Sequence, residues 1–236
     1  MHKQHGRGIL KAAKCKRGPP NDQKSPEKAC ITGKELNTMP KQSPTQREDR
    51  ERNLLDAAYR LFISKGQLKT SVDDIVQEAQ VAKGSFYTYF HSKEELTQTL
   101  IERLCTRILH ECYNDCRRRK VPDFAERVVL LVDSLLDHFK RNKLQLYLIQ
   151  RNFNWSMVEQ ELRCPTDHVW RELAESVHQS PLAQQKTPEE ITRMIFVLLE
   201  MCSATCYSSI IENSPAPIDQ MKPILYEVIR KTLAES

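Results

Sequence analysis

The chain has 236 residues, of which 39% are hydrophobic and 28% are charged, and its formal net charge is +5. A chain of this length holds one or two domains. Its apolar runs are short and interrupted by charge, which argues against a membrane-spanning helix of about 20 residues, and its basic N-terminus lacks the apolar core of a secretory signal. We therefore expect a cytoplasmic protein with reduced cysteines and no membrane partner.

Charge and glycine are both distributed unevenly along the chain. Before Arg47 there are ten Lys and Arg against three Asp and Glu, whereas the rest of the chain has 26 against 28. Gly66 and Gly84 are the only glycines after that point. Because sheet-rich folds use glycine in hairpin turns and bulges, this scarcity predicts an all-α protein with long helices.

Residues 1–46 are predicted to form a disordered basic tail. They contain five of the 12 prolines and show no lasting apolar period. The basic run at residues 11–17 could form an arm that contacts DNA phosphates, but an inert solvated tail is the simpler interpretation. A further interpretation is that translation starts near Met39, so that residues 1–38 are not made.

From Arg47 onward the apolar residues recur with a helical period, which predicts a first helix that ends near Gly66 at a residue of positive φ. Ser71, with Asp74 three residues later, is a capping box that opens a second short helix. A third short helix is predicted over residues 83–89, after a tight turn. Two short helices joined in this way are typical of a helix-turn-helix, whose second helix enters the major groove of DNA.

The rest of the chain also follows helical patterns. Ser92 and Glu95 form a second capping box, which opens a long helix that ends in a basic run at residues 117–120. Pro223 is expected in the first turn of the last helix, because proline disrupts a helix interior. The other predicted helices are a stripe from Val128 to Phe139, a shorter helix from Leu144 to Phe153, one that follows Cys164-Pro165-Thr166-Asp167, one that Thr187-Pro188-Glu189-Glu190 opens and that reaches Ile211, and the last, from near Asp219 to Leu233.

The predicted helix-turn-helix has the chemistry of a surface that contacts DNA. No acidic residue lies between Gln80 and Lys93, although the body around them is net negative. The hydroxyl and cationic side chains of this stretch can bond phosphates, which position a protein on DNA. Gly84, at the start of the third helix, would let the backbone approach a phosphate closely. The alternative is that Tyr87 and Tyr89 pack inward and that Lys93 is only a solvated helix start.

This region resembles the tetracycline-repressor (TetR) family of bacterial regulators. The resemblance implies an N-terminal three-helix DNA-binding head with a helix-turn-helix, over residues 47–107 with the motif at about 71–90. It also implies a larger helical domain, over residues 120–236, that binds an effector and forms the dimer. The matching residues are Leu54-Leu55-Asp56-Ala57-Ala58, Leu61-Phe62, Gly66, Thr70-Ser71-Val72-Asp73-Asp74-Ile75 and the run from Val81 to Leu96.

The resemblance also implies particular roles for residues of the motif. Phe86 and Phe90 are expected to pack inward and to fix the recognition helix. Gln80 departs from the family pattern, which often has glycine in the turn, and this leaves the turn geometry open. Ala82 stands where the family often has a small hydroxyl residue, which removes one phosphate contact. The implied DNA contacts are Ser71, Lys83, Gly84, Ser85, Tyr87, Thr88, Tyr89 and Lys93.

No motif indicates catalysis, so we expect no enzyme, no catalytic residue and no cofactor. The chain lacks a Ser/His/acid motif, a glycine-rich phosphate loop and a HExxH motif. Cys112 and Cys116 share one helix face, as do Cys202 and Cys206, and each pair could bind a soft metal or sense oxidants. Buried structural cysteines are the simpler interpretation, because neither pair has the CxxC spacing of zinc sites.

The helix predicted over residues 187–211 is apolar on more than one side, so it must be covered by more than the core of its own subunit. A homodimer would cover it, and the resemblance implies that the last two helices form the interface. This assembly would also match a near-palindromic double-stranded operator, which two heads would read about 34–36 Å apart.

The resemblance further implies a small-molecule pocket in the second domain. The predicted function is a dimeric repressor that an effector of unknown identity releases from its operator. The alternatives are a regulator that senses thiol oxidation or a metal, and a helical interaction module or enzyme with a vestigial head. The aromatic residues that could line the pocket, although each could instead be plain core, are Phe139, Tyr147, Phe153, Trp155 and Trp170.

Overall fold

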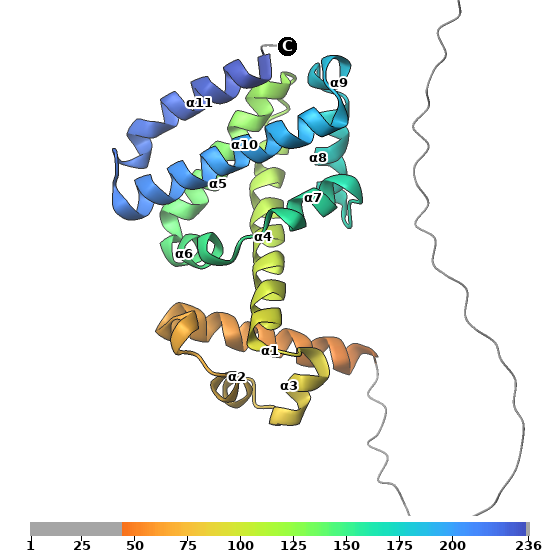
Figure 1. The fold of residues 1–236 in the computed structure, drawn as a ribbon, viewed down its shortest axis with the longest axis vertical. Helices are drawn as coiled ribbons and strands as arrows, with labels where there is room; N and C mark the ends of the chain where they lie inside the picture. The colour runs from red at the N-terminus through yellow and green to blue at the C-terminus, as the bar shows by residue number, and fades with distance from the viewer. Residues whose placement is uncertain (1–43, 235–236) are drawn as a thin grey trace, which may run out of the picture. The chain divides into compact units, whose positions relative to one another are not determined.

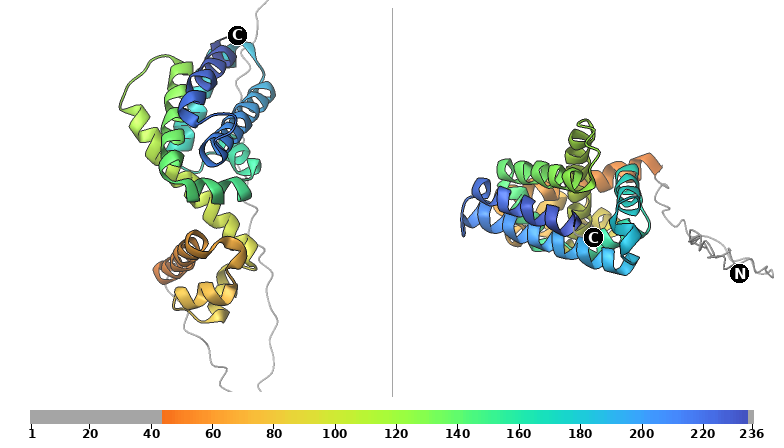
Figure 2. Two further views of the ribbon diagram at one scale, coloured as in Figure 1. Left: turned by 90° about the vertical axis from the view of Figure 1, so that its left-hand side faces the viewer. Right: turned by 90° about the horizontal axis from the view of Figure 1, so that it is seen from above.

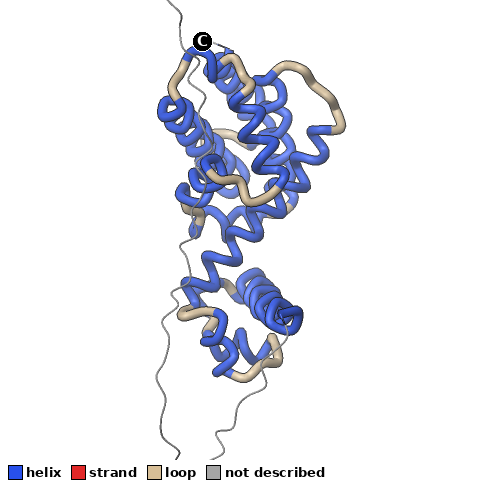
Figure 3. Tube along the Cα trace, turned by 90° about the vertical axis from the view of Figure 1, so that its right-hand side faces the viewer, coloured by secondary structure: helices blue, strands red, loops and turns tan. Residues whose placement is uncertain are grey.

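The computed structural model describes residues 44–234, and every regular element within them is helical (Figure 3), which confirms the all-α prediction. Two of the elements are short irregular turns, the 3-10 turn η1 and the π turn η2. The elements are α1 (Pro44–Lys65), η1 (Gln67–Lys69), α2 (Val72–Glu78), α3 (Lys83–Tyr89), α4 (Lys93–Arg117), α5 (Phe124–Arg141), α6 (Lys143–Asn152), α7 (Trp155–Arg163), α8 (His168–His178), α9 (Leu182–Gln185), α10 (Pro188–Tyr207), η2 (Ser208–Glu212) and α11 (Ile218–Ala234).

The predicted tail mostly lies outside the described residues. This holds for residues 1–43, and therefore for the basic run and for the alternative start at Met39. The first helix begins at Pro44 and so includes the last three residues of the predicted tail, 44–46. Proline suits the first position of a helix, because its φ is already helical and the N–H that it lacks would have no partner there.

Helices α1, α2 and α3 form a small unit (Figure 1), here called the head (residues 44–89). Its apolar side chains meet in one core. Leu54 on α1, Ile75 on α2 and Phe86 on α3 are fully buried in it. The core continues into the first turns of α4 through Leu96. Phe86 and Phe90 are 0% and 3% exposed, which confirms that they pack inward.

Local signals account for where the helices begin. Ser71 Oγ accepts the Asp74 N–H at 3.1 Å while the Asp74 carboxylate accepts the Ser71 N–H at 2.7 Å, which is the predicted capping box. Ser92 caps only half as predicted: its hydroxyl accepts the Glu95 N–H, but the Glu95 carboxylate accepts the N–H of His91 instead. That bond lowers the pKa of Glu95.

Asp74 makes the start of α2 sensitive to acid. Its carboxylate pairs with Lys65 Nζ at 2.8 Å and accepts bonds from the hydroxyl and N–H of Ser71. The bond from Lys65 and those from Ser71 hold the pKa of Asp74 well below its ordinary value. The folded pKa is therefore depressed, so this carboxylate stabilises the fold above the ordinary pKa of about 4. The contribution decreases progressively as the pH falls below that value and is fully lost only below the depressed pKa of the folded state.

We expect Asp74→Asn to make the free energy of unfolding depend less on pH in the acidic range. Urea unfolding at about pH 6 and about pH 3 would measure the change, and the difference between the two free energies should be smaller in the variant than in the parent chain. Asp56→Asn is the matched control, since Asp56 is an exposed carboxylate on α1. Equal pH dependence in Asp74→Asn and the parent chain would contradict the assignment.

Helix α4 leads from the head into the remaining helices, where it packs against α5 and α6 (Figures 1 and 2). Helix α5 also packs against α11, and α11 lies beside α10. These contacts enclose a second core, in which Val129, Leu136, Ile210 and Ile229 are buried. The Thr187–Glu190 capping box opens α10 as predicted.

Several features of the second half differ from the sequence prediction, among them the short helix α9, which was not predicted. Helix α7 was not predicted; it begins after Asn154, whose side chain caps it by accepting the Ser156 N–H at 2.9 Å. Helix α10 ends at Tyr207 and continues as the π turn η2 rather than as one α-helix. Pro223 is the sixth residue of α11, beyond the first turn, so the exposed Asp219 carbonyl lacks its donor within the helix.

The expectation that no helix could cross a membrane is wrong as regards length and composition. The helical segment Pro188–Glu212 is long and apolar enough to do so, and only 17% of its apolar window is buried in the chain. Glu189, Glu190 and Arg193 lie near the start of this segment. Glu200 is the only charged residue between 194 and 211. A helix that is apolar and uncovered by its own chain is also what a subunit interface requires.

Candidate nucleic-acid interface

The turn between α2 and α3 has helix-turn-helix geometry without a glycine. Gln80 adopts a positive φ of 56°, and the following N–H, of Val81, donates to Val76 O at 3.0 Å. A side chain in this left-handed region costs roughly 1–2 kcal/mol. Gln80 therefore adopts at some cost a conformation that glycine would adopt freely. Ala82 is the N-cap of α3 and makes no side-chain cap bond.

One face of α3 is exposed and carries four of the eight predicted contact residues, whereas Ser85 on the same helix is only partly exposed. Lys83, Gly84, Tyr87 and Thr88 are exposed, at the spacing i, i+1, i+4 and i+5 that places them on one side of a helix. Tyr87 is 53% exposed, so inward packing does not account for its position. Tyr89 is half-buried and packs against the core of the head, as the alternative interpretation expected.

The polar groups near this face are already paired with one another. Lys83 Nζ lies 2.7 Å from Asp73 Oδ1, and both side chains are more than half exposed. The bond to Asp73 raises the pKa of Lys83. The Ser71 hydroxyl is held by the capping box of α2, and Thr88 Oγ1 donates to Gly84 O at 3.2 Å. A phosphate at this surface would therefore replace the carboxylate of Asp73 at the ammonium group of Lys83.

Gly84 is not required by the fold. A Cβ placed on it would meet no atom within 4 Å, and its φ lies outside the left-handed region that favours glycine. Gly66 differs, because its φ of +88° is a conformation that L-residues rarely adopt. A need for glycine at position 84 would therefore come from a molecule that binds this surface and not from the fold of the chain.

Lys93 occupies a different environment from the other predicted contacts. Its Nζ donates to Thr70 O at 3.0 Å and to Gln67 O at 3.4 Å. These two carbonyls bracket the turn η1, which connects α1 to α2. The lysine therefore ties the start of α4 to the segment that precedes Ser71. The sequence could not show this, because the acceptors are backbone atoms more than 20 residues away.

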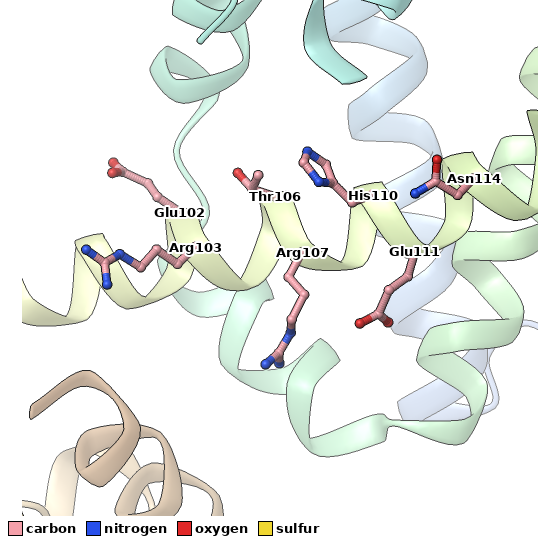
Figure 4. A pocket seen from close by; sticks show the side chains of 7 residues that line it. All are labelled: Glu102, Arg103, Thr106, Arg107, His110, Glu111 and Asn114. Carbon is pink, nitrogen blue, oxygen red and sulfur yellow. The ribbon is translucent and has the colours of Figure 1, made fainter. Parts of the chain in front are cut away.

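Neither of two surface pockets in the described residues gathers the five predicted pocket aromatics. One, of about 490 Å³, is lined by seven side chains of α4 alone (Figure 4), among them His110, which pairs with Asp167 at 2.9 Å. The other, of about 620 Å³, lies between α7 and the start of α10, where Trp155 packs edge-on against Phe196 at 5.2 Å.

The other four aromatics occupy varied positions. Phe139 packs against both cores and Phe153 against the first. Trp170 is 7% exposed, and its indole Nε1 has no hydrogen-bond partner. Tyr147 is 44% exposed beside the guanidinium of Arg151. The effector pocket stays a prediction.

The cysteine pairs do not have the electrostatics of thiol sensors. Burial raises the pKa of Cys202 to about 11 and that of Cys206 to about 12. It also raises the pKa of Cys112 and Cys116. Oxidation proceeds through the thiolate, which such values disfavour at neutral pH. No group of three His, Cys, Asp or Glu side chains able to hold a metal ion occurs in the part of the chain that the structure describes.

Residues 54–100 match the family described as bacterial regulatory proteins, tetR family. Two relatives are uncharacterized HTH-type transcriptional regulators of Bacillus subtilis (strain 168). YuxN is 31% identical over 104 residues, which cover 42% of this chain and 35% of YuxN. YvdT is 34% identical over 105 residues, which cover 44% of this chain and 51% of YvdT. The chain thus spans between about a third and a half of the length of these relatives.

The fold extends the likeness beyond the head. A solved TetR-family transcriptional regulator from Streptomyces coelicolor superposes with a TM-score of 0.59, covering 79% of this chain and 98% of that one at 17% identity. This likeness concerns the arrangement of helices, in the second half as well as in the first. Through residues 54–100, the chain is similar to the tetR family of bacterial regulatory proteins.

Proposed function

We propose that this chain is a sequence-specific DNA-binding transcriptional regulator, a dimeric repressor that a small-molecule effector releases from its operator. The observation that carries the proposal is the exposed face of α3. Lys83, Tyr87 and Thr88 project from it, around a glycine whose missing side chain the fold does not require. Cationic and hydroxyl groups on a short helix after a tight turn suit phosphate contacts and base edges in the major groove.

The dimer would form through α10 and α11. Their uncovered apolar side chains are Phe196 and Val197 on α10, which are 40% and 61% exposed, and Ile224 and Val228 on α11, which are 58% and 40% exposed. The two helices lie side by side, so these side chains can contribute to one surface. A second copy would bury it around a two-fold axis and present two heads to a near-palindromic double-stranded operator.

The remaining elements of the proposal concern regulation. Residues 47–107 serve as the DNA-binding domain and residues 120–236 as the effector-binding and dimerisation domain. The effector binds the second domain and favours a spacing of the heads that does not match the operator. The protein works in the cytoplasm, on the nucleoid, and is not an enzyme.

Selection of bound DNA from a random pool would test this function. The full chain is incubated with random duplexes, the retained duplexes are sequenced, and their affinity is measured against random DNA at several salt concentrations. We expect a near-palindromic site that the chain prefers over random DNA by about a thousandfold or more. Equal affinity for the selected and the random duplexes would instead identify a vestigial head and overturn the proposal.

Lys83→Ala should weaken binding to every sequence by a similar factor. Removing one phosphate contact per head also weakens the salt dependence of binding. The slope of the logarithm of the binding constant against the logarithm of the salt concentration should become shallower by about one unit for each bound head. The measurement is a fluorescence-anisotropy titration of the selected site over a series of salt concentrations. Arg171→Ala is the matched control, because it removes an exposed positive charge from α8. An unchanged slope in Lys83→Ala would refute the phosphate contact.

A further inference from the structure

Gln67 and Asn152 form a reciprocal pair of side-chain amides. Gln67 Nε2 donates to Asn152 Oδ1 at 3.1 Å, and Asn152 Nδ2 donates to Gln67 Oε1 at the same distance. Asn152 Nδ2 also donates to Leu148 O within its own helix, at 2.7 Å, which fixes the direction of its amide. Two amides can exchange both bonds only when they lie nearly coplanar and in one relative position, so this contact is sensitive to small displacements.

The two partners belong to different parts of the fold. Gln67 is the first residue of η1, directly after α1, and Asn152 is the last residue of α6, 85 positions later. The backbone of η1 leads through Thr70 into Ser71, the cap of α2. Lys93 holds the same turn from the other side through the carbonyls of Gln67 and Thr70. The amide pair therefore acts on the segment that sets where α2, and with it α3, begins.

A second polar contact joins α6 to the head. Gln145 Nε2 donates to Tyr59 OH at 2.7 Å, while Gln145 Oε1 lies 2.9 Å from His138 Nε2 on α5. The guanidinium of Arg107, on α4, lies 6.0 Å from the centroid of the Tyr59 ring. Besides the covalent path through α4, the head is thus fastened to α6 near both ends of that helix.

The other side of α6 contacts the proposed dimer helix. Ser203, on α10, donates through Oγ to Gln150 Oε1 at 3.0 Å. Leu148 and Ile149 of α6 are meanwhile buried in the core that includes the head. Helix α6 therefore lies between α10 and the head and bonds to both.

We propose that the Gln67–Asn152 pair is a positioning device that fixes the head to α6 and so sets the placement of the recognition helix. A shift of α6 would break or strain the paired amides and free η1, without any change in the residues that face DNA. The inference rests on the proposed function, because the placement of the heads matters only if two of them must match one operator. It adds a direct route from α6 to the head that does not pass along α4.

The pair acts by preorganisation rather than by contact with DNA. Once one head of a dimer is bound, a second head that is held in place meets its half-site at a high effective concentration. A loosened head instead occupies many positions, most of which do not match the half-site. A single half-site needs only one head and makes no demand on spacing. Loss of the pair should therefore weaken binding to the full operator and leave half-site binding unchanged.

The test uses the full chain with Gln67→Ala, Asn152→Ala, the double variant, and the exchanged pair Gln67→Asn with Asn152→Gln. Full-site and half-site duplexes from the selection are titrated with each protein. We expect each single variant to lose about three- to tenfold in full-site affinity, the range that one or two hydrogen bonds provide. The double variant should lose no more than the worse single variant, the exchanged pair should recover most of the loss, and the salt slope should stay unchanged.

Other outcomes would overturn the inference. Equal losses on full and half sites would assign the residues to the stability of the head, and additive losses in the double variant would show that the two amides act separately. Unchanged full-site affinity would remove any role in positioning. Gln160→Ala, an exposed amide on α7, is the matched control. The unaltered chain is measured first. If it prefers no sequence over random DNA, the proposed function itself fails, and the variants are not compared.

Discussion

Val197→Asp is expected to convert a dimer into a monomer and to lower operator affinity by about a hundredfold or more. Val197 is 61% exposed on α10, the largest exposed fraction among the exposed large apolar side chains of α10 and α11 that the structure describes. In a two-fold assembly, the substitution places a carboxylate on each copy within the same apolar surface. A buried carboxylate without a partner is strongly unfavourable, and two of them near the axis also repel each other.

Light scattering behind a sizing column would measure the mass of the variant over a range of concentrations. The fold of the isolated chain should survive, because the side chain at position 197 mostly faces solvent. Circular dichroism would confirm this by showing the helical signal of the parent chain. Gln160→Asp, which adds a carboxylate to the exposed surface of α7, should remain a dimer. A dimeric Val197→Asp protein with full operator affinity would exclude this face as the interface.

Gly84→Ala is expected to change stability and DNA binding in opposite directions. The added methyl group meets no atom of the chain within 4 Å, and the backbone there is not in the left-handed region. Alanine at such a position restricts the unfolded chain and stabilises by about 0.4–1 kcal/mol, which raises the melting temperature by a few degrees in a chain of this size. The same methyl group would keep the DNA backbone at a distance and cost about ten- to a hundredfold in affinity.

Gly66→Ala separates the two effects. Its backbone has a φ of +88°, so alanine there is strained and should lower the melting temperature. Thermal melts and operator titrations of both variants would be compared. A Gly84→Ala protein that melts higher and binds as well as the parent chain would show that nothing approaches this glycine closely. A protein that melts lower would contradict the space that the structure shows around it.

The sequence predicted those elements whose signals are local. The Ser71–Asp74 and Thr187–Glu190 boxes need only residues three positions apart, so the starts of α2 and α10 followed from the sequence alone. Helix α3 also has the predicted bounds. Helix α7 escaped prediction because only two residues separate it from α6 and a single asparagine cap marks its start.

Contacts between distant residues lay beyond such patterns. Lys93 looked like any exposed lysine at the start of a helix, because its acceptors are the carbonyls of Gln67 and Thr70. Gln67 and Asn152 gave no signal, since amides at two helix ends have no reason to meet until the chain folds. The sequence leaves the turn geometry at Gln80 open, because a positive φ at a residue other than glycine has no signal in the sequence.

Cys164 gives the chain a built-in position for a reporter group. It is the one exposed thiol among the six cysteines in the region that the structure describes, and it follows the last residue of α7. Replacing Cys15 and Cys30 by serine would leave it as the preferred target of a thiol-directed spin label. In a two-fold dimer the two labels would report one distance between the subunits, so a change of quaternary arrangement on adding a compound could be followed without a DNA assay.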